Sequence, residues 1–296
     1  MARKYVHIFK IKVDSTNSTR VLRQVRENLS TYSKTESGHS PFYIVTPNPE
    51  IISSAQVDQK LSKILNSAEV SLPDGIGLAA AHKYNQMWNP SCKLVRLPVL
   101  IAQGVVVGLA VVFDKGWLTK ELKIIRGREM FFEILKLANK KKWRIFLLGG
   151  LNKNTSKNAA INISKNLKSI KFMTEEGPLY DDDGKPRTKE DSNYNSEVIK
   201  KINNFKPHML FVGLRCPAQE KWVYTNIKNG IDIGGAMVVG RTFEYYSEDS
   251  KPSPKWMVDM GLEWLWRMLT GSTKFKRIWT AFPVFPLKVF WNKFSS

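Results

Sequence analysis

Two short apolar segments in the first third of the chain end in polar side chains that lie between prolines and glycines. The first leads to Thr46 and Asn48 in the letters TPNPE, and the second leads to Asp74 in LPDGIG. Proline fixes φ and moves the residue before it out of helical geometry, while glycine adopts backbone conformations closed to other residues. At the carboxyl ends of strands, such turns would present a hydroxyl, an amide and a carboxylate to one cleft. Both could also be ordinary turns, since Pro, Asn, Asp and Gly are the usual turn residues.

Two more strand-like segments end in residues that could bind a ligand. Residues 209–212 lead into PAQEKW, which presents Gln219 at a helix start, and residues 143–148 end in Gly149 and Gly150. A glycine pair before a helix can hold a phosphate through backbone N–H groups, but it falls short of a dinucleotide-binding fingerprint.

Three consecutive aspartates at residues 181–183 could be read as a metal site. They belong to a polar loop with Gly184 and Pro186, and their spacing does not match an EF-hand. The four histidines are scattered along the chain. We therefore expect no metal site.

Alternating strand-like and helix-like patterns must position these residues. They predict an α/β fold with a largely parallel, Rossmann-like sheet and flanking helices. The expected strands are residues 5–13, a segment at Ile44, and residues 70–72, 143–148, 209–212 and 231–239. The expected helices include residues 20–29, 51–66, 130–139, 155–167 and 197–204. The sheet should end near Gly240, which predicts a core over residues 1–245 and a C-terminal helical appendage over residues 246–296.

The composition favours a polyanionic partner. Lys and Arg outnumber Asp and Glu by 46 to 26, which gives a net charge of +20. Such an excess suits nucleic acid, an anionic membrane surface or phosphorylated substrates. Only two cysteines occur, without metal-binding spacing, and the N-terminus has no apolar stretch of signal-peptide length. We expect a cytoplasmic protein.

A long apolar segment interrupts the alternating pattern at residues 97–113, within an apolar insertion of about residues 89–122. It has no charged residue and reaches the lower length limit of a membrane span. A true single span would place the two halves of the sheet on opposite sides of the membrane, which one continuous sheet forbids. Three interpretations remain: a buried core segment, a membrane-dipping or interfacial segment, and a contact between protein copies.

The C-terminal fifty residues combine basic and aromatic side chains. Five of the nine tryptophans lie there, and after Ser250 eight Lys and Arg face two acidic residues. Such segments lie at membrane interfaces, where aromatic rings enter the headgroup boundary and cations meet anionic lipid. Nucleic acid could use the same residue types. No nucleic-acid motif accompanies them, so we expect an anionic membrane surface as partner and no nucleic acid.

Five motifs in this order, TPNPE, LPDGIG, FLLGG, PAQEKW and GLEWLWR, resemble those of the WecG/TagA/CpsF family of bacterial glycosyltransferases. The resemblance implies an inverting transfer of a sugar, typically N-acetylmannosamine, from a UDP-sugar donor. The implied acceptor is a polyprenyl-diphosphate-linked sugar at the cytoplasmic face of the membrane, where the protein would be peripheral or partly membrane-dipping. No metal ion and no cofactor beyond the UDP-sugar co-substrate is implied.

The resemblance also assigns roles within the core. The proposed catalytic base of the family falls on Asp74, and its pocket Thr and Asn fall on Thr46 and Asn48. Its helix-start Gln falls on Gln219, and the acidic residue near the uracil falls on Glu244, where relatives commonly have Asp. A carboxylate such as Asp74 is a suitable base for an acceptor hydroxyl if its environment raises its pKa.

The appendage would supply positive charge. The family's appendage arginines fall on Arg267, Lys274 and Arg277. Without a metal, the leaving UDP diphosphate needs fixed cations or helix N-termini, and the two arginines would be the more directional donors. The alternative function is a non-catalytic basic protein that binds membrane or nucleic acid on the same α/β scaffold.

Overall fold

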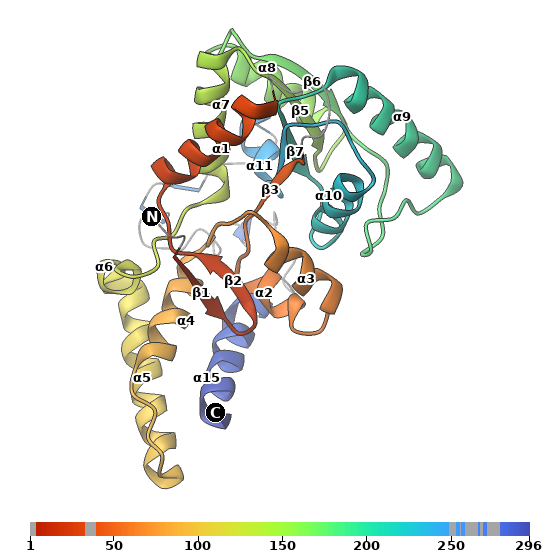
Figure 1. Cartoon of the computed structure of the whole chain (residues 1–296). Helices are drawn as coiled ribbons and strands as arrows, with labels where there is room; N and C mark the ends of the chain where they lie inside the picture. Colours follow the sequence, from red (N-terminus) through yellow and green to blue (C-terminus); the bar gives the residue numbers. More distant parts are fainter. Residues whose placement is uncertain are drawn as a thin grey trace.

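The fold is a parallel α/β sheet with helices on both faces (Figure 1). The computed structural model describes residues 4–32, 40–248, 253–254, 256–257, 266, 269–270 and 279–296. Within these residues, six parallel strands pair in the order β4-β3-β8-β7-β5-β6. They are β3 (Phe42–Val45), β4 (Val70–Ser71), β5 (Arg144–Gly149), β6 (Lys171–Glu175), β7 (Met209–Gly213) and β8 (Gly235–Val238). The predicted α/β class and parallel sheet are confirmed.

Side chains along each central strand alternate between two apolar layers, as the period of a strand requires. In β5, for example, Phe146 and Leu148 belong to one layer, and Ile145 and Leu147 belong to the other. Because both faces are buried, the strands read as continuous apolar runs, which is typical of parallel sheets. This explains why the sequence pattern revealed them.

The helices divide between the two layers. On one face lie α2 (Pro49–Ala55), α3 (Gln59–Ser67), α4 (Ile76–Gln86), α9 (Lys189–Phe205) and α10 (Ala218–Lys228). On the other lie α1 (Ser18–Tyr32), α7 (Gly127–Lys141), α8 (Thr155–Ser164) and α11 (Thr242–Tyr246). Since all six strands are parallel, their carboxyl ends meet at one edge, where the connections to these helices begin.

Two predicted elements differ from the structure, and one strand was missed. The expected strand at residues 5–13 is an antiparallel hairpin of β1 (Tyr5–Ile8) and β2 (Ile11–Asp14) outside the main sheet, because Phe9 turns the chain at a φ of 52°. The expected helix at residues 51–66 is divided into α2 and α3, since the Asp58 carboxylate accepts the Leu61 N–H at 2.9 Å and starts a new helix. Strand β6 was not predicted.

The apolar segment forms most of α5 (Lys93–Phe113), which continues into the short α6 (Lys115–Thr119). Figure 1 shows α5 and the C-terminal helix α15 (Phe285–Ser295) extending away from the sheet beside α4. A short kinked segment, η1 (Thr280–Val284), in which Phe282 has an extended backbone, precedes α15. Only 22% of the apolar window in α5 is buried, so the interpretation as a buried core segment is wrong. By length and composition alone, Leu94–Phe113 could cross a membrane.

Candidate functional site at the carboxyl edge of the sheet

The two proline- and glycine-rich turns form one structural unit at the ends of β3 and β4. The Leu72 N–H donates to the Val45 carbonyl at 2.8 Å, and the Asp74 N–H donates to the Pro47 carbonyl at 3.0 Å. The parallel pairing of the strands therefore continues into the turns. Asp74 is half-buried beside the segment that carries Thr46 and Asn48.

Glycines allow the close approach of these turns. Gly75 has a φ of +99°, where a side chain would be strained. A Cβ on Gly77 would lie 2.9 Å from Cγ of Pro49, which leaves no room for a larger residue without movement of the proline ring. The start of α4 thus packs against the TPNPE motif, and this contact fixes the position of the backbone at Asp74.

The two polar groups of the Asn48 side chain have different roles. Its Oδ1 accepts the Ile51 N–H at 2.9 Å and caps α2. The amide NH₂ is the part that a ligand oxygen could engage, because Oδ1 is already held by the helix. Asn48 can therefore serve as a hydrogen-bond donor beside Asp74.

Thr46 is nearly buried and links three elements. Its hydroxyl lies 3.5 Å from the Val238 carbonyl at the end of β8. The first turn of α7 packs against it, since a Cβ on Gly127 would lie 3.1 Å from Cγ2 of Thr46. The Ile125 N–H donates to the Pro73 carbonyl at 3.0 Å and brings the start of α7 to the second motif as well.

Gln219 joins α10 to the turn after β8. Its Oε1 accepts the Gly240 N–H at 3.2 Å, and its Nε2 donates to Oε1 of Glu220 at 2.8 Å. Both side chains are at least 98% buried. Because both ends of the Gln219 amide are engaged, its geometry favours positioning of this turn over direct contact with a sugar.

Glu244 follows the same turn, in the first turn of α11. It is buried, and its Oε1 lies 4.0 Å from Nε of Arg241. A carboxylate at a helix N-terminus is stabilised by the helix dipole. The structure thus brings Gln219 and Glu244 to opposite ends of one short segment, next to the strand that Thr46 contacts.

A buried lysine was missed by the sequence interpretation, although it lies in the PAQEKW motif. The Lys221 amine is within 2.7 Å of an Asp58 oxygen and 2.9 Å of an Asp183 oxygen. Burial alone would lower the pKa of Lys221, but the hydrogen bonds to both carboxylates outweigh it and raise the pKa. The same bond holds the pKa of Asp183 below its usual range. One aspartate of the acidic run therefore anchors its loop to α10.

The remaining contacts of the acidic loop are also structural. Oδ1 of Asp181 accepts the N–H groups of Asp183 and Lys185 at 2.9 and 2.8 Å and closes the turn. Within the described ranges, no group of three or more His, Cys, Asp or Glu side chains is arranged to hold a metal ion.

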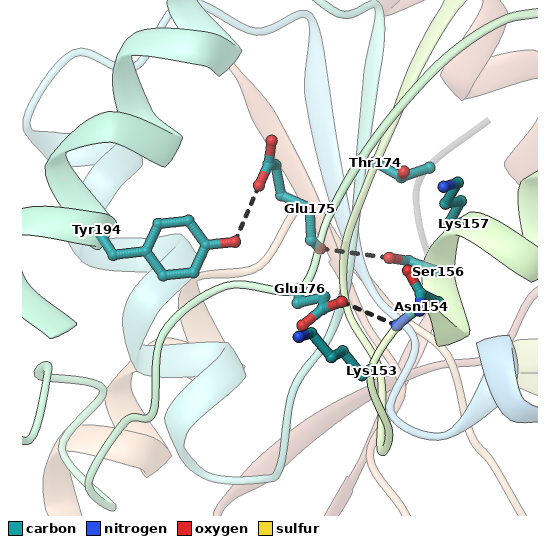
Figure 2. Close-up of a pocket in the computed structure, with 8 residues that line it drawn as sticks. All are labelled: Lys153, Asn154, Ser156, Lys157, Thr174, Glu175, Glu176 and Tyr194. Atoms are coloured by element: carbon teal, nitrogen blue, oxygen red, sulfur yellow. Dashed lines mark hydrogen bonds between the residues drawn. The ribbon is translucent and has the colours of Figure 1, made fainter.

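A separate open cavity of about 310 Å³ lies at the ends of β5 and β6 (Figure 2). From the strand order, β5 lies four strand spacings, or about 19 Å, and β6 five strand spacings from β4, which Asp74 follows. Figure 2 shows the Tyr194 hydroxyl directed at Glu175, and the Glu176 carboxylate accepting the Asn154 N–H at 2.8 Å. That carboxylate takes up the N–H of Asn154, the residue that precedes α8, at the end of the helix that is suited to binding anions.

The glycine pair before this helix is engaged as well. The Gly150 N–H donates to the Gly213 carbonyl at 3.1 Å, which joins the ends of β5 and β7. Gly149 and Gly150 have φ values of 108° and 131°, which only glycine adopts easily. The pair therefore serves this strand connection.

The three predicted appendage cations, Arg267, Lys274 and Arg277, lie outside the described residues. The site as described comprises the base candidate Asp74, the donor Asn48 and the buried Thr46. Gln219 and Glu244 lie at the two ends of the short segment that follows β8.

In parallel α/β folds, ligands bind outside the carboxyl ends of the strands, which is where these polar side chains and glycines lie. The model of the glycosyl transferase WecG/TagA/CpsF family matches residues 6–95 and 99–296. The chain belongs to this family and is a glycosyltransferase. The resemblance found in the sequence motifs is thereby confirmed.

Curated relatives agree with the family match over nearly the whole chain. An N-acetylglucosaminyldiphosphoundecaprenol N-acetyl-beta-D-mannosaminyltransferase of Staphylococcus aureus (strain MRSA252) is 27% identical over 278 residues, covering 94% of this chain and 89% of the relative. A protein of the same description from Staphylococcus aureus (strain NCTC 8325 / PS 47) matches with the same identity and coverage.

Proposed function

We propose that this chain transfers N-acetylmannosamine, or a related sugar, from a UDP-sugar to a polyprenyl-diphosphate-linked sugar in bacterial cell-surface polysaccharide synthesis. The observation that carries the proposal is the match over 94% of the chain to relatives whose name specifies that sugar and a lipid-diphosphate acceptor. We further propose that transfer inverts the configuration of the reacting carbon, needs no metal, and takes place at the cytoplasmic face of the membrane.

Asp74 is proposed as the general base. A hydroxyl of the acceptor sugar would lose its proton to the Asp74 carboxylate as its oxygen attacks the anomeric carbon, and the bond from that carbon to UDP would break on the opposite side. The short backbone contacts around Asp74 support this role, because they hold the backbone from which the carboxylate extends before substrate binds. Asn48 would donate its amide N–H to an oxygen of the bound donor.

The leaving diphosphate gains negative charge in this reaction. We propose that Arg267 and Arg277, with Lys274 as a less directional third cation, stabilise it. Glu244 is proposed to lie near the uracil, with Gln219 holding the turn that leads to it.

The direct test is release of UDP from UDP-N-acetylmannosamine in the presence of a lipid-linked N-acetylglucosamine diphosphate analogue. Asp74→Asn should lower turnover by about 10²- to 10⁴-fold, the usual contribution of a general base. The matched control is Asp232→Asn, because Asp232 precedes β8 at the opposite edge of the sheet and pairs there with Lys206. If Asp74→Asn keeps full turnover while folded, the assignment of the base is wrong.

A panel of UDP-sugars with the same acceptor would identify the donor. The net charge of +20 also fits a second function, the non-catalytic binding of membrane or nucleic acid. That function predicts tight, salt-sensitive binding of vesicles or oligonucleotides without UDP release from any donor in the panel.

A further inference from the structure

An unbroken line of exposed apolar side chains runs along α5. We call it the α5 stripe, and it consists of Leu94, Leu97, Ile101, Val105, Leu109 and Val112, all between 43% and 88% exposed. Their spacing of three or four residues places them on one side of the helix. A helix of this length is about 31 Å long, so the stripe forms a continuous apolar surface. Such a surface differs from the single exposed apolar residues that are common on soluble proteins.

The opposite side of α5 is already packed. Leu100, Val107 and Ala110 are buried, and α5 contacts both α4 and α15. The stripe is therefore an additional apolar surface that the described part of the fold does not cover.

A buried lysine fixes α15 to this helix. The Lys293 amine donates to the Tyr84 carbonyl on α4 and to Oε1 of Gln103 on α5, the latter at 2.9 Å, and lies 4.5 Å from the centre of the Tyr84 ring. The Arg96 guanidinium donates to the Phe294 carbonyl at 2.9 Å. The helices α4, α5 and α15 thus form one packed group, in which α15 also exposes apolar side chains such as Trp291.

The chemistry of the stripe indicates what covers it. Between residues 97 and 113 the only polar side chain is Gln103, which is buried and bonded to Lys293 and to the Trp88 carbonyl. Protein interfaces carry about one hydrogen bond per 100–200 Å² and are rich in aromatic and arginine side chains. A purely aliphatic face without donors or acceptors matches acyl chains, which require neither.

The surroundings of the stripe favour anionic lipid at the interface over a full membrane crossing. Residues 87–92 lie next to α5 without regular secondary structure, and Arg96 donates to the Pro90 carbonyl among them. Such backbone and a guanidinium are unfavourable in the hydrocarbon core. The exposed Lys288 on α15 and Lys120 after α6 can meet lipid phosphates, in keeping with the net charge of +20.

We propose that the α5 stripe, together with the exposed apolar side chains of α15, docks this protein flat onto an anionic lipid bilayer. The helix axis lies along the interface, with the stripe toward the acyl chains and Lys120 and Lys288 at the headgroups. This docking surface is independent of which sugar is transferred.

The test is co-sedimentation of the full chain with vesicles of phosphatidylcholine and phosphatidylglycerol. Ile101→Glu combined with Leu109→Glu places two charges in the stripe and should lower the vesicle partition coefficient at least tenfold. Ile161→Glu combined with Leu179→Glu is the matched control, because both residues are exposed apolar side chains elsewhere, at 53% and 66% exposure. The control should stay within about twofold of the wild type. Equal binding by the stripe variant and the wild type would overturn the proposal.

A second measurement distinguishes lipid from a second copy of the chain and gives the orientation. The alternative result is that the wild type does not bind vesicles and elutes as a dimer in size-exclusion chromatography, while the stripe variant elutes as a monomer. In that case the stripe is a contact between copies, and the proposal fails. Nitroxide labels at residues 97 and 109, in a cysteine-free background, should report similar shallow depths of about 5–10 Å below the headgroups. A large difference in depth between them would contradict a flat orientation.

The outcome is separable from that of the proposed function. The stripe variant should release UDP normally with a water-soluble acceptor analogue, and lose activity only when the acceptor is embedded in vesicles. A protein without transferase activity that still binds vesicles through the stripe would overturn the proposed function and leave the docking surface standing.

Discussion

The carboxyl edge of the sheet and the group formed by α4, α5 and α15 use opposite kinds of chemistry. At the sheet edge, polar atoms from distant parts of the chain form hydrogen bonds, as when the Gly240 N–H donates to Gln219 at 3.2 Å or the Lys221 amine donates to Asp183 at 2.9 Å. Between residues 97 and 113 of α5, the only polar side chain, Gln103, is buried, and the α5 stripe on the outer side is aliphatic. Directional bonds suit recognition of one small ligand, whereas an aliphatic surface suits a partner without defined atomic positions.

The first prediction separates ligand binding from helix capping at Asn48. Asn48→Asp keeps an oxygen for the Ile51 N–H, so the free energy of unfolding should change by less than about 0.5 kcal/mol. Asn48→Ala loses the cap and should cost about 1 kcal/mol. Both lose the amide donor, and both should lower kcat/KM about 100-fold. UDP release and urea unfolding measured on the same samples check this, and normal activity of Asn48→Asp would show that the cap is the whole role of Asn48.

The second prediction concerns acid stability of the sheet. His208, at the start of β7, accepts the Arg144 N–H through Nδ1 at 3.1 Å. Burial and the nearby Arg144 lower its pKa from 6.5 to about 4. The unfolded chain therefore binds a proton between pH 6.5 and 4 that the folded chain does not, so stability should fall as the pH falls, by up to about 3 kcal/mol.

The measurement is the urea midpoint between pH 7 and pH 4. His208→Gln should remove that part of the decrease, and His7→Gln, at an exposed histidine, should retain it. If the wild type and His208→Gln lose stability in parallel over this range, His208 is not the group responsible.

The third prediction concerns the stability of the group formed by α4, α5 and α15 at alkaline pH. Burial lowers the pKa of Lys293 from 10.5 to about 8. Between pH 8 and 10.5 the unfolded chain holds the proton and the folded chain does not, so stability should rise with pH over this interval. We expect a rise of up to about 3 kcal/mol, the value that a pKa lowered over this interval implies.

Thermal unfolding between pH 7.5 and 10.5 measures this rise. Lys293→Met should flatten it, whereas Lys288→Met, on the exposed side of the same helix, should leave it unchanged. A rise that persists in Lys293→Met would assign it to another group.

The same two regions show what sequence patterns can and cannot predict. Strands such as β5 and β7 were found because burial on both faces makes them continuously apolar. Strand β6 was missed because it lies at the edge of the sheet with half-exposed side chains, so it has no apolar run. The motifs around Asp74 were found because their prolines and glycines are unusual locally.

What the sequence could not predict depends on contacts between distant residues. Lys221 looks like any other helical lysine until Asp58 and Asp183 fold around it. Residues 97–113 have the same letters whether they are buried or exposed, so only the packing of α4 and α15 on one side of α5 distinguishes the two.

The central claim is that Asp74 performs the chemistry at the sheet edge. It is tested most directly by single-turnover UDP release from UDP-N-acetylmannosamine with a saturating lipid-linked acceptor analogue. The wild type and Asp232→Asn should react at the same rate, and Asp74→Asn should react at least 100 times more slowly while unfolding at the wild-type urea midpoint. A folded Asp74→Asn that releases UDP at the wild-type rate would contradict the account.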